Sequence, residues 1–478
     1  MTSEDNNIVE SEHHAPFFAA RQAIRRHATG GNILIVATIL AMVVANIPAI
    51  NHYYFDFWEH EVRLQIGDFN LFSHGGEPMN MLEFINDALM AIFFFSIGLE
   101  IKREVLVGEL SSFKQALLPI MGAIGGMLVP VGIYYMLSKG TDYVGGSAIP
   151  MATDIAFSLG VLAMLGSRVP ISLKIFLTTL AVVDDIGGII VIAAFYSSHI
   201  EYMLLIYAAA LLGVLLLGSV MHIKSKIFYL GIGGCVWFLF LNSGVHPTIA
   251  GVLVAFCVPA SPVFKPRRYV KIIRSSIAHF KHEDDERLDK SSILNREQMD
   301  WLKKIEYASD KVISPLQDLE DSLHPVVNNF IVPLFAFANA GIFLLNLDPA
   351  SIVEGISLAI ICGLVIGKCL GIFLFSWLTV KLHLAPMPLR ANWKMMMSVA
   401  MLGGIGFTVS LFIANLSFAG MGVHGADLLN HAKLGIVVGS LISGILGFIL
   451  LGHTLPKGNH YVEQDDEHPL AENPVAEN

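Results

Sequence analysis

The chain has 478 residues, of which 54% are hydrophobic and only 15% are charged, and its mean hydropathy is +0.63. These values lie outside the range of ordinary soluble domains and predict a protein that resides in lipid. Because a membrane-spanning helix needs about 20 apolar residues, this length accommodates about a dozen spans with short connections. The net charge of −10 does not itself indicate a charged partner, since much of it lies in the two tails, and no nucleic-acid partner is expected.

Apolar runs bounded by glycine, proline and charged residues predict an all-α polytopic membrane protein. They place about 12 transmembrane helices, at residues 31–49, 82–99, 116–137, 147–165, 171–197, 202–220, 226–242, 245–260, 326–346, 353–380, 393–415 and 431–453. The expected organisation is a cytoplasmic tail (1–30), helices 1–8 (31–260), a cytoplasmic insertion (261–325), helices 9–12 (326–453) and a cytoplasmic acidic tail (454–478). The N-terminus lacks the basic region of a removable signal peptide, so the first helix is expected to be retained.

Lysine and arginine residues concentrate on alternate connections between these helices. By the positive-inside rule, this alternation places both termini in the cytoplasm and supports an even number of helices. The basic residues that define the cytoplasmic side are Arg21, Arg25, Arg26, Lys102, Arg103, Lys114, Arg168, Lys174, Lys224, Lys226, Lys265, Arg267, Arg268, Lys271, Arg274, Lys381, Arg390, Lys394 and Lys457.

Two connections have patterns of their own. Residues 62–71 alternate apolar and polar side chains around Gly67-Asp68, which predicts a small β-hairpin on the extracytoplasmic side. A lone hairpin is only marginally stable, so this one either pairs with a second copy in a homodimer or folds back on its own membrane domain. The insertion at 261–325 is charged and partly helical in pattern, and is interpreted as a solvated, regulatory or merely tolerated loop.

Four charged side chains fall deep within predicted helices, where each is a functional hypothesis by default because burial of charge in lipid is costly. They are Asp154, Asp184, Asp185 and Lys368. Asp184 and Asp185 are neighbours and point about 100° apart, so that one can face an ion while the other faces a cation such as Lys368. Such a site binds a proton or a small hard cation through oxygen ligands, but not both at once, which suffices for antiport. A plain stabilising pair between lysine and aspartate remains the alternative for Lys368.

The fourth and eleventh helices carry interruptions. Pro150, Thr153 and Asp154 occur together in the fourth, and Leu402–Thr408 contains the three glycines Gly403, Gly404 and Gly406. Irregular backbone at membrane depth is tolerated only inside protein or beside a water-filled cavity, so both helices are predicted to be broken. They are the second members of two helix trios, 3–5 and 10–12, which we interpret as inverted repeats around a midplane site. Close helix packing is the other interpretation of the glycines.

At these residues the chain resembles the NhaA family of bacterial sodium/proton antiporters, over about residues 30–452 apart from the insertion. The segments that carry the resemblance are Asn86–Met90, Gly98–Glu100, Ala152–Phe157, Asp184-Asp185, Ser243–His246, Leu334–Gly341 and Gly403–Thr408. Together they are highly specific. The enlarged insertion and longer tails depart from the family pattern, so no role in pH response is assigned within them.

The resemblance implies an electrogenic exchanger of inward protons for outward Na+ or Li+ in the bacterial inner membrane, without a cofactor. It implies that Asp185 is the main Na+ ligand and that Asp184 is its proton-carrying neighbour, paired with Lys368, while Thr153 and Asp154 support the crossing of broken helices. The family also forms homodimers through the outside hairpin. Three further positions match residues tied to pH response, namely Glu100, Glu104 and His246.

Other interpretations remain open for these positions and for the function. His246 also fits a packed or interfacial histidine, and Glu100 and Glu104 also fit an interfacial charge cluster with Lys102 and Arg103. An intramembrane enzyme would use aspartates as a protease dyad or as a Mg2+ site for a prenyl diphosphate, but it would leave Lys368 and the repeat without a role. A sodium-coupled symporter of related fold would need a roomier polar cavity.

Overall fold

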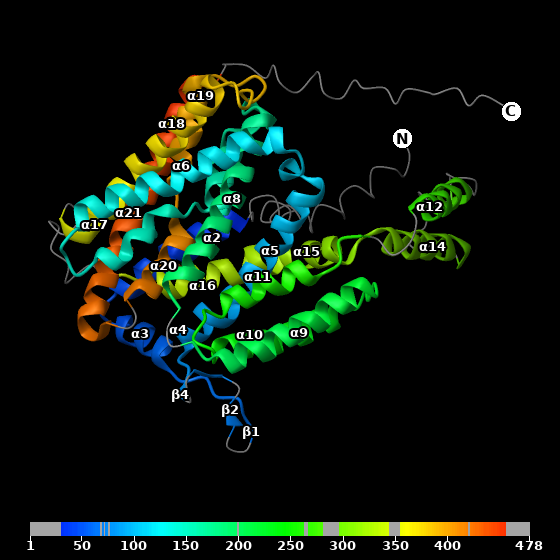
Figure 1. Ribbon diagram of the computed structural model, residues 1–478, viewed down its shortest axis with the longest axis horizontal. Coiled ribbons are helices and arrows are strands. Elements are labelled where there is room, and N and C mark those ends of the chain that lie inside the picture. Colours follow the sequence, from blue (N-terminus) through cyan, green and yellow to red (C-terminus); the bar gives the residue numbers. More distant parts are fainter. Residues whose placement is uncertain are drawn as a thin grey trace, which may run out of the picture. The chain divides into compact units, whose positions relative to one another are not determined.

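A computed structural model describes residues 30–455, except 67–68, 71, 75–76, 198–199, 262–265, 281–295, 344–353 and 419–420. Apart from residues 30, 454 and 455, the predicted tails therefore lie outside the described residues. Figure 1 labels the helices and strands of the chain. The described residues divide into two compact units: one comprises those within 1–60, 109–196 and 332–478, and the other comprises those within 61–108 and 197–331.

The described part of the chain contains seven helices long and apolar enough to cross a membrane, or up to nine if each of two bent pairs forms one span. Two shorter apolar helices, α10 (Lys226–Leu241) and α11 (Thr248–Cys257), add to these. The protein is thus a multi-pass helical membrane protein. The expected total of twelve spans stays a prediction.

In the first unit, the predicted first trio consists of α6 (Phe113–Ser138), a broken helix and α8 (Ile171–Phe195). The broken helix begins as a 3₁₀ segment, η3 (Val144–Met151), and resumes as α7 (Ile155–Met164). Between them the backbone is extended at Ala152 and at Asp154, the N-cap of α7. The interruption thus falls where proline, threonine and aspartate occur together. A short 3₁₀ segment, η4 (Gly166–Arg168), leads into α8.

The second trio lies in the same unit. Its first helix runs as α17 (Gly355–Ile361), a π-helical segment η8 (Cys362–Gly367) and α18 (Lys368–Lys381). Its second helix is interrupted between α19 (Trp393–Leu402) and α20 (Phe407–Phe418), which are bent by 45°, and its third is α21 (Gly422–Thr454). The break at 403–406 coincides with the predicted glycine cluster.

Helix α6 packs closely against α18 and the end of η8 because glycines lie in the contact. A Cβ built on Gly371 would lie 2.1 Å from the carbonyl oxygen of Gly125, and one on Gly367 would lie 2.7 Å from Cα of Pro130. Only residues without a side chain permit this approach, as in other membrane helix pairs. The close packing brings Lys368, at the start of α18, into the interior of the unit, where its side chain is fully buried.

The first predicted helix differs from the expectation for 31–49. The structure has α2 (Gly30–Asn46) followed, after a bend of 111°, by α3 (Asn51–Glu59). The α3 sequence is aromatic and polar rather than uniformly apolar. It buries Tyr54 and Trp58 beside Phe337 of α16 (Val332–Asn339), and the Tyr54 hydroxyl donates to the Phe337 carbonyl oxygen at 2.5 Å. A composition scan for spanning helices misses an element of this kind.

The second unit contains the predicted second helix as α4 (Met81–Phe84), the π-helical η1 (Ile85–Leu89) and α5 (Met90–Val107). Asn80 and Glu83 form a capping box that starts α4. Helices α9 (Tyr202–Val220), α10 and α11 pack with α5 around a core that includes Phe95, Leu215 and Ala250. Helix α15 (Pro315–Val326) begins at the N-cap Ser314 and continues into η5 (Val327–Ile331).

The second unit also contains two short antiparallel ladders at the segment where a hairpin was predicted. Strand β1 (Gln65–Ile66) pairs with β2 (Phe69–Asn70), and β3 (Ser73–His74) pairs with β4 (Glu77–Pro78). The turn Gly67-Asp68 lies outside the described residues. Pairing with a second copy through this segment stays a prediction.

Candidate ion-binding site

The buried centre of the first unit holds an ion pair between two helices. Lys368, at the start of α18, donates to Oδ2 of Asp184, in the middle of α8, and to Oγ1 of Thr153 at 2.9 Å. The three side chains are at most 1% exposed. An isolated buried charge is costly, and the lysine and carboxylate therefore stabilise each other.

The Thr153 hydroxyl connects this pair to both interrupted helices. Its oxygen lies 2.7 Å from Oδ2 of Asp184 and 2.8 Å from the carbonyl oxygen of Gly403. Because a hydroxyl has one proton, it donates to one of these acceptors at a time while it accepts from Lys368. A change in the charge of Asp184 therefore affects whether the Thr153 hydroxyl donates to Asp184 or to the carbonyl oxygen of Gly403, the C-cap of α19.

Two further carboxylate features lie close to this pair. Oδ1 of Asp184 is buried and has no hydrogen-bond partner among the described residues. The adjacent Asp185 is only 5% exposed and points about 100° away around the same helix. Oxygen ligands of this kind suit a small hard cation or a proton.

Asp154 joins the N-termini of two half-helices. Its Oδ1 accepts from the backbone N–H of Phe157, in the first turn of α7, at 3.0 Å. Its Oδ2 accepts from the backbone N–H of Thr408 at 3.2 Å and from the Thr408 hydroxyl at 2.7 Å, in the first turn of α20. A carboxylate between two helix N-termini offsets the partial positive charge of both. This placement is compatible with the supporting role at the crossing that the family resemblance implied for Asp154.

The three candidate glycines lie at the crossing itself, where they leave no room for side chains. A Cβ on Gly404 would lie 2.3 Å from the carbonyl oxygen of Leu364, and one on Gly406 would lie 2.7 Å from that of Ala152. A Cβ on Gly403 would lie 2.5 Å from the side chain of Ile372. The two breaks are also joined by the backbone N–H of Asp154, which donates to the carbonyl oxygen of Ile405 at 2.6 Å.

The three candidates for pH response all lie in the second unit. Glu104 pairs with Arg103 at 3.1 Å, and Arg103 Nε donates to Glu320 of α15 at 2.9 Å. Glu100 and Arg103 line an open cavity of about 600 Å³ together with Glu320. Burial raises the pKa of Glu320, which lies outside the predicted membrane spans, and the Arg103 guanidinium opposes that rise.

His246, the third candidate, is a buried histidine that lies close to the carboxylate of Asp87. Its Nε2 lies 3.5 Å from a carboxylate oxygen of Asp87 in η1, and its Nδ1 lies 2.9 Å from the Thr248 hydroxyl. Trp237 Nε1 donates to the Asp87 backbone carbonyl at 3.0 Å. Both the packed and the pH-responsive interpretation are compatible with these contacts.

Sequence reasoning did not single out several buried polar groups. Lys433 of α21 is only 7% exposed although it falls at the edge of a predicted helix, where it was not counted among the deep charges. Asn415 of α20 donates to Asn339 of α16 at 2.8 Å. Asn339, in the segment Leu334–Gly341, was the sequence signal for this hydrogen bond. A single uncharged amide does not interrupt an apolar run, however, so the pattern did not mark it as buried and paired.

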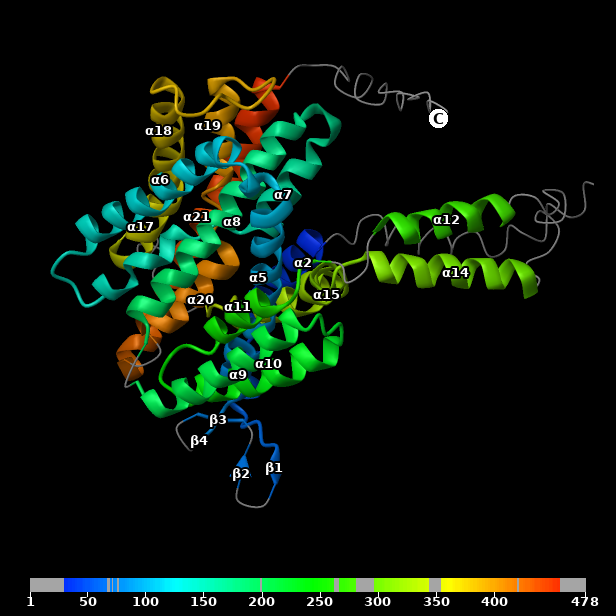
Figure 2. The same cartoon turned by 45° about the vertical axis from the view of Figure 1, so that its right-hand side comes forward.

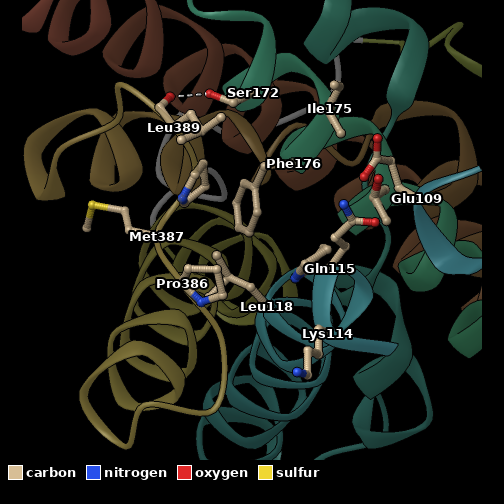
Figure 3. A pocket seen from close by; sticks show the side chains of 13 residues that line it. Glu109, Lys114, Gln115, Leu118, Ser172, Ile175, Phe176, Pro386, Met387 and Leu389 are labelled. Atoms are coloured by element: carbon tan, nitrogen blue, oxygen red, sulfur yellow. Dashed lines mark hydrogen bonds between the residues drawn. The ribbon is translucent and has the colours of Figure 1, made fainter. Parts of the chain in front are cut away.

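A separate pocket of about 270 Å³ opens in the first unit at the ends of α6 and α8 (Figure 3). Figure 3 shows Phe176 and Leu118 facing its interior, and the Ser172 hydroxyl donating to the Leu389 carbonyl oxygen at its edge. None of the predicted site residues lines this pocket. Among the described residues no group of three or more His, Cys, Asp or Glu side chains is placed to hold a resident metal ion.

A buried ion pair at the junction of two broken helices, within a multi-pass helical membrane protein, defines the class of membrane transporters with discontinuous helices. Comparison with known proteins specifies this class further. Residues 21–451 match the family described as Na+/H+ antiporter 1.

The relatives include the Na(+)/H(+) antiporter NhaA of Phocaeicola vulgatus, 52% identical over 92% of this chain and 97% of the relative. That of Bacteroides fragilis is 53% identical over 90% of this chain and 96% of the relative. The Na(+)/H(+) antiporter NhaA 2 of Syntrophotalea carbinolica is 41% identical over 91% of this chain and 96% of the relative. The chain therefore belongs to the NhaA family of Na+/H+ antiporters, which implies a transporter rather than an enzyme.

Proposed function

We propose that the protein exports Na+, or Li+, in exchange for protons by alternating access, and that the ion and the protons compete for a site at Asp184 and Asp185. The observation that carries this proposal is the buried pair of Asp184 and Lys368 at the crossing of the broken helices, in which one carboxylate oxygen has no hydrogen-bond partner among the described residues.

Charge counting supports the competition. With both aspartates ionised and Lys368 protonated, the site holds one net negative charge in a region that excludes water. A buried uncompensated charge is strongly unfavourable, so one additional proton or one cation neutralises the site. A bound Na+ and a bound proton each neutralise the same negative charge, so binding of Na+ from one side releases the proton.

Lys368 gives a route to electrogenic exchange. A Na+ ion at Asp184 would replace the ammonium group as its counter-charge, and Lys368 would then lose its proton as well as its partner. Loss of that proton, together with the one from the carboxylates, amounts to two protons per Na+. The Na+-loaded site then carries one net negative charge whereas the proton-loaded site is neutral, and this difference is the charge that the cycle moves across the membrane. If Lys368 keeps its proton, one proton exchanges for one Na+ and the process is electroneutral.

The wider setting of the proposal follows from the sequence. The Lys and Arg distribution supports a cytoplasmic position for both termini, and the protein is proposed to act in the bacterial inner membrane in pH and sodium homeostasis. Glu100, Glu104 and His246 are proposed to mediate its pH response, and the hairpin at 62–71 is proposed to form a homodimer. The salt-bridged cluster around Arg103 and the contact of His246 with Asp87 support the first of these proposals.

The test measures Na+-driven dissipation of a pH gradient in proteoliposomes with a pH-sensitive dye. Wild type should dissipate the gradient, whereas Asp184→Asn and Asp185→Asn should be inactive. Asp142→Asn is the matched control, because the Asp142 side chain is 79% exposed and its loss should leave exchange intact. Silence of the wild type with Na+ and Li+ at every pH, or exchange by both site variants, would refute the proposal. A membrane-potential dye in the same vesicles distinguishes electrogenic from electroneutral exchange.

A further inference from the structure

The insertion contains a pair of helices that the family resemblance does not account for. Helices α12 (Pro266–Phe280) and α14 (Arg296–Val312) lie side by side and run in opposite directions (Figure 2). Ser276 of α12 is 1% exposed and Ala308 of α14 is fully buried, so these small residues mark the sides through which the helices touch. Both helices are strongly amphipathic, so each gathers its apolar side chains on one side.

The apolar side of α12 extends beyond its contact with α14. Val270 is 45% exposed and Ile277 is 46% exposed. At about 100° per residue, they lie on one side of the helix with the exposed Arg274 beside them. This strip is an aliphatic surface next to a basic side chain, and no described part of the chain covers it.

Helix α14 has a matching strip. Met299 is 46% exposed and Leu302 is 38% exposed, and their spacing of three residues places them on one side of the helix. Around the helix from Ala308, Leu302 lies about 120° away and Met299 about 180° away. In an antiparallel pair this rotation turns Leu302 to the same side of the pair as Val270 and Ile277, and Met299 to the adjoining outer edge of α14. We call the surface formed by these four residues the hairpin face.

Charge and tethering indicate what the hairpin face meets. The α12 sequence contains three arginines and one lysine and no acidic residue. Helix α12 begins only eight residues after α11 ends, since residues 258–265 separate Cys257 from Pro266. Those residues span no more than about 30 Å even when extended, so a membrane helix tethers α12 close to the bilayer surface.

We propose that the hairpin face lies on the headgroup region of the cytoplasmic leaflet and that its basic side chains bind anionic lipids there. An aliphatic strip flanked by Lys and Arg is the pattern of helices that lie in the membrane interface. The negative surface potential of that leaflet complements the acid-free α12. The inference rests on the cytoplasmic placement of the insertion proposed above, but not on the ions that the protein exchanges.

The test uses the full-length protein, one copy per lipid nanodisc, with its four cysteines replaced by serine. A fluorescent label on Ile277→Cys reports the hairpin face, and the same label on Ser275→Cys is the matched control. Ser275 is also exposed but lies on the far side of α12. Bromine-labelled lipid chains quench a fluorophore that reaches the membrane interior, and the discs contain either phosphatidylcholine alone or an equal mixture with phosphatidylglycerol.

The expected result is strong quenching of the label at Ile277→Cys and little at Ser275→Cys, with the difference greatest in the anionic discs. Adding Lys271→Ala and Arg274→Ala should weaken docking about 30-fold, since each basic residue near an anionic surface contributes about 1 kcal/mol, or about fivefold. Equal quenching at the two positions would overturn the proposal. Shielding of Ile277→Cys only in discs that hold two copies would instead assign the hairpin face to contact between copies.

Failure of this inference and failure of the proposed function are distinguishable. Reactivity of Ser275→Cys toward an impermeant thiol reagent in everted vesicles but not in intact cells would verify the cytoplasmic placement, whereas the opposite result would refute both that placement and the inference. Quenching in a protein that does not exchange Na+ for protons would leave the inference standing and remove the proposed function. Exchange of Na+ for protons without a difference in quenching between the two label positions would leave the proposed function standing and refute the inference about the hairpin face.

Discussion

Asp154 is predicted to stabilise the crossing of the broken helices, and its loss should be measurable as stability. Its carboxylate accepts one hydrogen bond at the N-terminus of α7 and two at the N-terminus of α20. Removal of an N-cap side chain costs about 0.5–2 kcal/mol, so loss of two caps in Asp154→Ala should cost about 1–4 kcal/mol. Thr408→Val removes only the hydroxyl bond and leaves the backbone bond, so it should cost about 1 kcal/mol.

The assay is thermal unfolding of the purified protein in detergent, followed through intrinsic tryptophan fluorescence. Asp154→Asn should fall between the other two variants, since its amide keeps one acceptor oxygen but turns a donor toward a backbone N–H. The order of melting temperatures should therefore be wild type, Thr408→Val, Asp154→Asn and Asp154→Ala. An Asp154→Ala variant that unfolds with the wild type, or above Thr408→Val, would refute this account of the two caps.

Three further predictions concern the buried ion pair, the glycines of the broken helix and the Glu320 carboxyl group. Lys368→Met leaves the Asp184 carboxylate buried without its counter-charge and should destabilise the fold by about 3–5 kcal/mol, whereas the double variant with Asp184→Asn should recover most of that loss in the same unfolding assay. Gly404→Ala should abolish exchange because its Cβ would meet a backbone carbonyl oxygen at 2.3 Å, whereas Gly160→Ala, with open space at its Cβ, should transport normally and unfold no earlier than the wild type. The raised pKa of Glu320 means that its carboxyl group binds a proton more tightly in the folded than in the unfolded protein. Protonated Glu320 therefore contributes stability at low pH, and this contribution is lost as the pH rises through the raised pKa. Glu320→Gln should remove that part of the pH dependence, and an unchanged profile of melting temperature against pH would contradict the assignment.

Much of the candidate site follows from residue types whose behaviour in a membrane is strongly constrained. Proline and glycine at 150 and 403–406 signalled interruptions, and the structure breaks both helices there. A lone buried lysine needs an acidic neighbour, and this requirement indicated the contact that Lys368 makes with Asp184. A continuous helix through these residues, or an unpaired charged lysine in the membrane, would cost several kcal/mol, and the sequence pattern is informative for that reason.

Other elements lack such a constraint. The π-helical segments η1, η5 and η8 share no sequence pattern, because a shift of the backbone hydrogen bonds by one residue leaves no mark in composition. Helix α3 escaped prediction because its burial depends on Phe337, nearly 300 residues away in the sequence. Contacts of this range are decided by tertiary packing rather than by local pattern.

The insertion is an intermediate case. Its charged composition distinguishes it from the predicted membrane spans, but the pairing of α12 with α14 depends on which residues of each amphipathic helix face the other. Helix α15 also falls within the predicted insertion, yet it joins the packed second unit through Arg103 and Glu320. Its start follows from the cap at Ser314, whereas its burial follows only from the fold.

The central claim is that Na+ and protons compete for one site, and the apparent affinity for Na+ at a series of pH values tests it most directly. In proteoliposomes, the Na+ concentration that gives half-maximal exchange should rise at least about tenfold for each unit fall in pH on the acidic side, because at least one proton must leave for each Na+ bound. The maximal rate should stay the same across that range. A half-maximal concentration that is independent of pH, with a maximal rate that falls instead, would show that the proton acts away from the Na+ site and would contradict the account.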